Sequence, residues 1–233
     1  MPVLRLPSLP ATAGKQHWGN LPGAALSLAI AEAANSAKRF TLLLTADSQS
    51  AERLEQELSF FAPELPVLHF PDWETLPYDL FSPHQDIISQ RIAALYRLPE
   101  LKHGILVVPI TTALHRLAPT RFLLGSSLVL DVGQRINVDD MRARLEATGY
   151  RYVDTVYEHG EFTVRGALID LFPMGSKQPF RIDLFDDEIE TLRTFDPETQ
   201  RSIDKVESIK LLPAREFPLE KKAVTDFRGC LLY

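Results

Sequence analysis

The spacing of residues that would bind a nucleoside triphosphate is incomplete in this chain of 233 residues. A phosphate-binding loop needs Gly-x-x-x-x-Gly-Lys followed by Ser or Thr, because backbone amides and the lysine neutralise the phosphates while the hydroxyl binds the metal. The Gly14-Lys15 pair has Leu9 where the first glycine should stand and Gln16 where the hydroxyl should stand. Gly23 is followed directly by Ala24 and Ala25 and not by a lysine. We therefore do not expect ATP hydrolysis.

A string of carboxylates is the second candidate for chemistry. Asp183, Asp186, Asp187 and Glu188, with Asp170 near them in the sequence, could hold the divalent ions of a two-metal nuclease. The alternative is a solvated hairpin turn, because Asp186 and Asp187 fall between two expected strands and aspartate suits such turns. We favour the turn.

Two further motifs have a catalytic or binding interpretation beside a structural one. The sequence Glu-His-Gly-Glu at residues 158–161 could be an acid/base pair, but the glycine at its centre favours a turn between strands. Trp73, Tyr78 and Phe81 could stack nucleic-acid bases. Residues 71–86 contain no lysine or arginine and four carboxylates, so core packing or a protein contact is favoured for these rings.

One surface with binding chemistry follows from strand alternation. Successive side chains of a strand point to opposite faces, so the strand expected over residues 179–185 places Arg181, Asp183 and Phe185 on one face. The other face, expected to be buried, carries the apolar residues Phe180, Ile182 and Leu184.

A preceding strand brings a second arginine to this surface. Arg165 alternates with the apolar residues of its own strand, and we expect Leu168 to point inward with them. If the two strands lie in one sheet, Arg165 and Arg181 stand beside Phe185 on the outer face. Arginine next to an exposed ring is typical of a protein-binding hot spot, since a guanidinium can bind a carboxylate through two hydrogen bonds. The alternative is an ordinary solvated face with one stray phenylalanine.

The elements that must position these residues form two groups. The first alternates helices with nearly continuous apolar runs, which are typical of parallel strands buried on both faces. Strands are expected over residues 39–46, 66–70 and 104–110, and helices over 23–38, 51–61, 86–98 and 111–117. The chain up to residue 126 is therefore predicted to be an α/β domain with a parallel sheet.

The pattern changes near residue 127. A strand over 127–132 and a helix over 138–148 precede strands over 152–157, 161–165, 167–172, 179–185, 188–195 and 206–212. Turns at residues 186–187 and 196–198 are expected to join the last three strands into hairpins. Residues 127–212 are predicted to be a separate, inserted and mostly antiparallel α+β domain. A third segment, 213–233, is expected to be the truncated start of a further domain, with a helix over 219–227.

Composition and charge limit the classes of partner. The chain is 45% hydrophobic and 24% charged, as in soluble globular proteins, and no apolar run approaches the ~20 residues of a membrane span. It has a single cysteine and no signal-peptide pattern at its start, so we expect a cytoplasmic protein. Residues 127–212 carry eleven basic and seventeen acidic side chains, which disfavours tight nonspecific DNA binding. A basic spot on that background favours a specific protein contact.

Four motifs resemble the N-terminal region of the bacterial transcription-repair coupling factors (Mfd). They are DWETLPYD at 72–79, SPHQD at 82–86, RGALIDLFPMG at 165–175 and FDDEIE at 185–190. The resemblance extends from about residue 21 to residue 227, and this region is in turn similar to the first domains of the excision-repair subunit UvrB. It implies a degenerate RecA-like domain over residues 1–126, a UvrA-binding insert over 127–212, and the start of a returning domain over 213–233.

The resemblance also implies a partner and a site. The family's UvrA-contacting positions fall on Arg165, Arg181, Asp183 and Phe185, the face that strand alternation exposes. UvrB-like proteins have Arg-x-Arg-Gly where this chain has Thr-Val-Arg-Gly at 163–166, so one cationic contact is missing or supplied elsewhere.

We therefore expect a non-enzymatic adaptor that recruits UvrA in transcription-coupled nucleotide excision repair. It is expected to be a monomer without cofactor, metal or membrane contact. In a full-length family protein, RNA polymerase and DNA would be bound by regions absent from this chain. The alternative is a DNA-acting domain of helicase or nuclease type.

Overall fold

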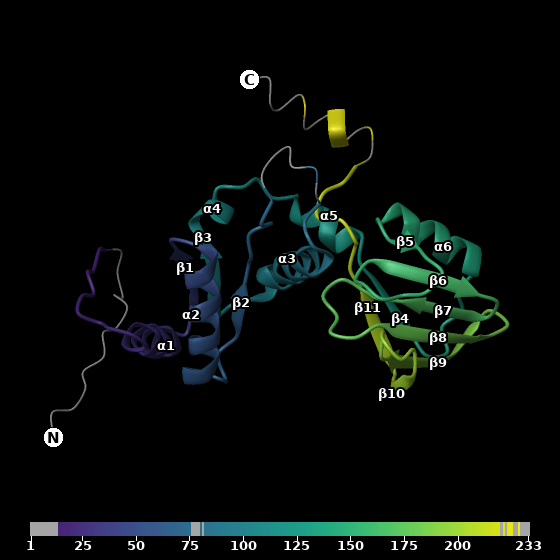
Figure 1. Cartoon of the computed structure of the whole chain (residues 1–233), viewed down its shortest axis with the longest axis horizontal. Coiled ribbons are helices and arrows are strands. Elements are labelled where there is room, and N and C mark those ends of the chain that lie inside the picture. The colour runs from purple at the N-terminus through teal and green to yellow at the C-terminus, as the bar shows by residue number, and fades with distance from the viewer. Residues whose placement is uncertain are drawn as a thin grey trace. The chain divides into compact units, whose positions relative to one another are not determined.

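The computed structural model describes residues 14–75, 80, 82–219, 221, 223–225 and 228 (Figure 1). Its contacts divide the chain into two compact units, the first of residues 1–72 and 97–115 and the second of residues 73–96 and 116–233. Nearly all of helix α3 (Gln85–Arg97) therefore belongs to the second unit, although it precedes residue 126. The domain boundaries at residues 126 and 212 stay predictions.

A three-stranded parallel sheet is the centre of the first unit. Its order is β1-β3-β2, and both outer strands pair in parallel with β3. The elements of this unit are α1 (Ala25–Ala37), β1 (Phe40–Thr45), α2 (Ser48–Phe61), β2 (Val67–His69), a 3-10 turn (Leu98–Glu100), β3 (Gly104–Pro109) and α4 (Ile110–Ala113). Helices α1 and α2 pack on the sheet through an apolar core that includes Ala34, Leu58 and Ile105. The predicted parallel α/β sheet is confirmed.

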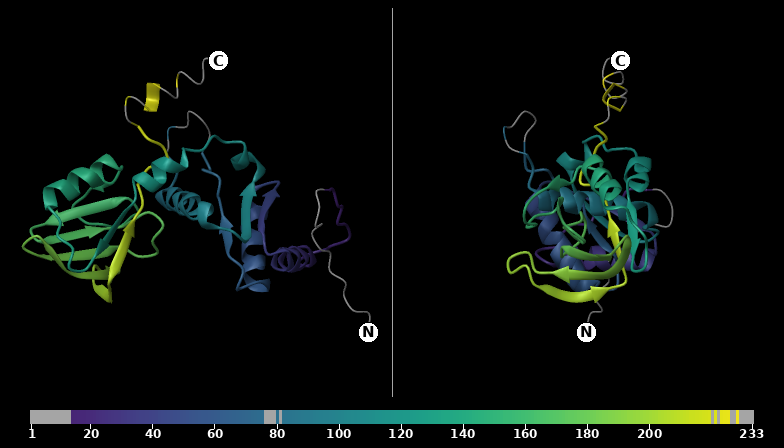
Figure 2. Two further views of the ribbon diagram at one scale, coloured as in Figure 1. Left: turned by 180° about the vertical axis from the view of Figure 1, so that it is seen from behind. Right: turned by 90° about the vertical axis from the view of Figure 1, so that its right-hand side faces the viewer.

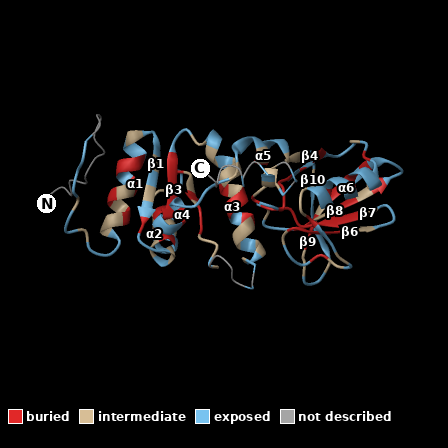
Figure 3. Cartoon of the chain, turned by 90° about the horizontal axis from the view of Figure 1, so that it is seen from above, coloured by how far each residue is buried: buried red, intermediate tan, exposed pale blue. Residues whose placement is uncertain are grey.

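Strand β1 is not buried on both faces, contrary to the prediction. Phe40, Leu42 and Leu44 are exposed, whereas Leu43 packs against the core under the helices. The reason is position: β1 lies at the edge of the sheet, while β3 lies between two strands and is buried at every residue (Figure 3). A continuous apolar run does not reveal how many neighbours a strand has.

The second unit contains a six-stranded sheet in the order β10-β9-β8-β7-β6-β5. All pairs are antiparallel except β5 with β6. The strands are β5 (Arg151–Tyr152), β6 (Glu161–Arg165), β7 (Leu168–Leu171), β8 (Phe180–Phe185), β9 (Glu188–Phe195) and β10 (Ser202–Val206). A separate antiparallel pair joins β4 (Leu128–Asp131) to β11 (Ser208–Leu211), and the helices are α3, α5 (Thr120–Gly125) and α6 (Val138–Ala147). The mostly antiparallel α+β part is thereby confirmed.

One face of the six-stranded sheet packs against the hydrophobic core of this unit. Helix α6 lies over it and contributes Met141 and Leu145, and the β4–β11 pair contributes Leu130 and Ile209 (Figure 2). The sheet supplies Phe162, Ile169, Ile182, Ile189 and Leu192, each almost fully buried. Because apolar residues take this face, the polar residues between them form the opposite one.

Several predicted elements in the second unit were wrong in extent. The strand expected over residues 206–212 is observed as β11, but it pairs with β4 and not with β9. The strand that forms the hairpin with β9 is β10, which was not predicted. The run Ser-Ile-Asp-Lys-Val of β10 has no clear apolar alternation, so the sequence did not indicate it. Of the strand expected over 152–157, only Tyr152 is in a strand, the two-residue β5, and α5 was missed.

The helix expected over residues 219–227 lies partly outside the described residues. In the part of the chain that the structure covers, no helix combines the length and apolar character required to cross a bilayer.

Candidate functional site

The polar face of the six-stranded sheet is called the outer face below. Two adjacent rows of cross-strand neighbours define it, because residues paired across antiparallel strands point to the same side. The first row is Thr163, Asp170, Arg181, Arg193 and Lys205, and the second is Arg165, Leu168, Asp183 and Thr191. Phe185 follows Asp183 by two positions at the end of β8.

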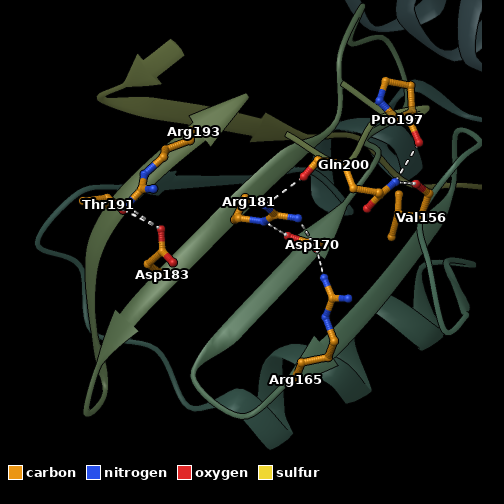
Figure 4. Close-up of polar contacts among 9 residues, drawn as sticks. All are labelled: Val156, Arg165, Asp170, Arg181, Asp183, Thr191, Arg193, Pro197 and Gln200. Carbon is orange, nitrogen blue, oxygen red and sulfur yellow. Dashed lines mark hydrogen bonds and ion pairs between the residues drawn. The ribbon is translucent and has the colours of Figure 1, made fainter. Parts of the chain in front are cut away.

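A buried carboxylate, Asp170, holds the two arginines predicted for this surface. Arg181 donates from Nε to Oδ1 of Asp170 at 2.8 Å and from Nη2 to Oδ2 at 3.0 Å, while Arg165 donates to Oδ2 as well (Figure 4). The side chain of Asp170 is only 1% exposed, so the two guanidinium groups balance a charge that has left water. The sequence-based prediction that Arg165 and Arg181 share one face is confirmed.

The guanidinium of Arg181 is engaged within the molecule. The side chain of Arg181 is 16% exposed, and its Nη1 donates to the backbone oxygen of Gln200 at 3.2 Å. The guanidinium carbon, Cζ, lies 4.9 Å from the centre of the Phe195 ring. The hydrogen bonds to Asp170 raise the pKa of Arg181, so this charge is fixed. Docking onto carboxylates through Arg181, as first expected, would require a partner to reach donors that already bind Asp170 and Gln200.

Arg165 and Phe185 project from the outer face. The side chain of Arg165 is 47% exposed although one of its nitrogens binds Asp170, and Phe185 is 70% exposed. Asp183 is intermediate, with an exposed fraction of 27%, and its Oδ2 accepts from the hydroxyl of Thr191 at 2.7 Å and pairs with Arg193 at 3.2 Å. The ring of Phe185 and the guanidinium of Arg165 are therefore accessible to a partner, and both lie near the paired carboxylate of Asp183.

The orientation predicted for Leu168 was wrong. It pairs with Arg165 on one side and with Asp183 on the other, so it lies on the outer face and not with Phe162 and Val164. The reason is the tight turn between β6 and β7, in which Gly166 adopts a φ of 63° and the chain reverses after two residues. Counting alternation through a turn misassigns the face.

Arg193 is a polar residue of the outer face that sequence reasoning missed. It lies directly opposite Arg181, and Asp183 lies directly opposite Thr191. Strict alternation from Ile189 would have placed Thr191 and Arg193 on the buried face with it. The observed pairing shifts register between Asp183 and Leu184, so Ile189 and Leu192 are both buried and Arg193 lies on the outer face.

The carboxylates considered as a metal site do not form one cluster. Asp170 and Asp183 are paired with arginines, whereas Asp186 and Asp187 form the turn between β8 and β9, as favoured from the sequence. Asp186 has a φ of 55°, a conformation that aspartate tolerates in turns. Among the residues that the structure describes, no three His, Cys, Asp or Glu side chains are grouped so that they could hold a metal ion.

The Glu-His-Gly-Glu motif is the turn that was favoured over an acid/base pair. Gly160 has a φ of 79°, and Glu161 binds the loop by accepting from the backbone nitrogens of Tyr157 at 2.8 Å and Glu158 at 2.9 Å. Burial acts to raise the pKa of Glu161, but these two hydrogen bonds and that from Arg151 outweigh it, so the pKa is lowered. The carboxylate is a structural anion.

Trp73 has an intramolecular partner, in agreement with core packing or a protein contact rather than base stacking. Its indole nitrogen donates to Glu216 at 3.1 Å, and Arg91 lies over its ring at 4.6 Å. Arg91 also forms two 2.8 Å hydrogen bonds with Glu216, and both side chains are buried. Tyr78 and Phe81, the other two rings considered for stacking, lie outside the described residues.

Comparison with known protein families matches the part of the chain that contains this sheet. Residues 128–217, which include the whole outer face, match the model of the UvrB interaction domain.

The whole chain resembles longer proteins. It is 50% identical over 223 residues to the transcription-repair-coupling factor of Escherichia coli, a match that covers 95% of this chain and 19% of that protein. The corresponding protein of Haemophilus influenzae is 51% identical over 211 residues, a match that covers 91% of this chain and 18% of that protein. The protein of Bacillus subtilis is 31% identical over 211 residues, a match that covers 90% of this chain and 18% of that protein. The chain thus spans about a fifth of the length of these relatives, and the resemblance inferred from the four motifs is confirmed.

Proposed function

We propose that this chain, which follows the transcription-repair coupling factors over nearly all of its length, is a non-enzymatic adaptor module that binds and recruits UvrA in transcription-coupled nucleotide excision repair. The observation that carries the proposal is that the exposed ring of Phe185 and the half-exposed guanidinium of Arg165 fall within residues 128–217, the segment that matches the UvrB interaction domain. The relatives are named for coupling transcription to repair, and this name supports the biological setting.

The site residues we propose are Arg165, Arg181, Asp183 and Phe185, of which Phe185 and Arg165 contact UvrA and the other two position the surface. Phe185 is the apolar anchor, because its ring is exposed at the end of β8 and an aromatic side chain buries a large area on binding. Arg165 supplies the outward cation and donates to a carboxylate of UvrA. Arg181 and Asp183 lie beside them on the same face and are held in position, Arg181 by Asp170 and Asp183 by Thr191.

Calorimetric titration of the purified chain with UvrA tests this proposal. Arg165→Ala is expected to weaken binding by about 1–2 kcal/mol, the loss typical of truncating a contact residue of an interface. Arg142→Ala is the matched control, because Arg142 is 49% exposed and also paired with a carboxylate, but lies on α6. Equal affinity of the Arg165→Ala variant and the parent chain would contradict the assigned contact.

We also propose that residues 1–126 form a degenerate RecA-like domain that contributes no ATPase activity. The support is the incomplete phosphate-binding motif around Gly14-Lys15. The test is to measure phosphate release from ATP by the purified chain and by its Lys15→Ala variant. Hydrolysis by the parent chain that is lost in the variant would overturn this part of the proposal, because a contaminating enzyme would be unaffected by the substitution.

A further inference from the structure

Two basic residues of the outer face have no role in the site proposed above. The first row of the face continues from Arg181 to Arg193 on β9 and from Arg193 to Lys205 on β10. Three cations therefore stand side by side across three neighbouring strands, and the row ends at β10, an edge strand of the sheet.

Arg193 is partly committed and partly open. Its side chain is 37% exposed, and one terminal nitrogen lies 3.2 Å from Asp183 and 3.2 Å from the hydroxyl of Thr191. Its Nε atom is enclosed, yet within the described part of the molecule this atom has no hydrogen-bond partner. Lys205 is exposed on the edge strand. Because Nε is enclosed, the donors that a partner could reach are the exposed terminal part of the Arg193 guanidinium and the ammonium of Lys205.

The charge of the two rows is opposite to that of the surrounding sequence. The rows contain four cations and two carboxylates, and both carboxylates pair with arginines of the same rows. Residues 127–212 as a whole carry an excess of six acidic side chains. A small positive area on an acidic background attracts an anionic surface of matching size, while the background repels an extended polyanion. This contrast favours an acidic protein surface over a nucleic acid.

We infer that Arg193 and Lys205 extend the UvrA-binding surface from β8 to the edge of the sheet at β10, where they bind carboxylates of UvrA. The inference rests on the proposed function and adds two contact residues to it. Lys205 lies at the rim, where a charge acts mainly on the rate of association and on its dependence on salt. Arg193 lies between Lys205 and Arg181, so it makes the basic area continuous.

The test is the association of UvrA with charge-reversed variants of the chain at two salt concentrations. Lys205→Glu is expected to lower the affinity about three- to tenfold at low salt, mainly through slower association, with a smaller loss at high salt. Lys177→Glu is the matched control, because Lys177 is an exposed lysine of the same unit that lies outside the six strands. Arg193→Ala is expected to lower the affinity by a similar factor, and circular dichroism verifies that this variant is folded.

The outcomes separate this inference from the proposal on which it rests. If Lys205→Glu weakens binding and Lys177→Glu does not, the inference stands. If Arg165→Ala weakens binding while Lys205→Glu and Arg193→Ala do not, the inference is overturned and the proposed function remains. If none of the three changes affinity for UvrA, both are overturned. Weaker retention of the Lys205→Glu variant on duplex DNA, with unchanged UvrA affinity, would assign the row to nucleic acid and also overturn the inference.

Discussion

Asp170 and Arg181 face each other across strands β7 and β8, and the guanidinium binds both carboxylate oxygens, at 2.8 and 3.0 Å. Asp170 is almost completely enclosed, so its charge depends on this arginine and on Arg165 from the neighbouring strand. One buried anion on β7 thereby fixes two cations, one on each neighbouring strand, β6 and β8 (Figure 4). The arrangement positions Arg165 with part of its guanidinium bound and the remainder open to a partner.

Asp170→Asn is expected to destabilise the chain by about 2–3 kcal/mol, because it leaves two guanidinium groups beside a neutral amide that cannot match both. Urea denaturation followed by circular dichroism measures the change. Asp187→Asn is the control, since Asp187 is 58% exposed at the β8–β9 turn. A loss from Asp170→Asn no larger than that of the control would show that the buried pair adds nothing to stability.

Glu161 makes stability depend on pH. Its pKa is lower in the folded chain than in the unfolded one, so the unfolded state binds the proton more readily. The carboxylate therefore adds stability above its ordinary pKa of about 4.3, and this contribution is lost as the pH falls through the lower folded value. Glu161→Gln is expected to be less stable than the parent at pH 7 and to lose less stability on acidification.

Thermal unfolding between pH 3 and 7 measures this difference between the Glu161→Gln variant and the parent. Glu158→Gln provides the comparison, because the side chain of Glu158 is 54% exposed and lies 3.7 Å from the same Arg151. Parallel pH profiles for the parent and Glu161→Gln would contradict the assigned role of the carboxylate.

The buried pair of Arg91 and Glu216 joins helix α3 to the segment after β11. Glu216→Ala is expected to cost about 3–5 kcal/mol, because it leaves a buried guanidinium without its carboxylate. The emission of Trp73 is expected to change as well, since its indole nitrogen loses the hydrogen bond to Glu216. Measurement in a Trp18→Phe background isolates that signal, and an unchanged unfolding midpoint and spectrum would refute the expectation.

The sequence was sufficient where a pattern is local. Strand β9 is observed over the predicted residues 188–195, and the inward set of β8 is buried at Ile182 and Leu184 as alternation required. Arg165 and Arg181 were placed on one face for the same reason.

The sequence was insufficient where the outcome depends on pairing between distant segments. The partner of β11 is β4, some eighty residues earlier, and nothing in the local pattern of either strand specifies that choice. The burial of Arg181 depends on Asp170 from the preceding strand and on Gln200 from the loop between β9 and β10. Exposure of an arginine on a sheet face thus could not be judged before its neighbours were known.

The affinity of the Phe185→Ala variant for UvrA tests the central claim most directly. Phe185 is exposed on the outer face, so removing its ring is expected to leave the fold intact and to reduce the affinity about tenfold or more. Phe60→Ala is the matched control, because Phe60 is a 78% exposed phenylalanine on α2, outside residues 128–217. The account predicts weaker binding for Phe185→Ala alone in calorimetric titrations, and equal affinities for both variants and the parent would contradict it.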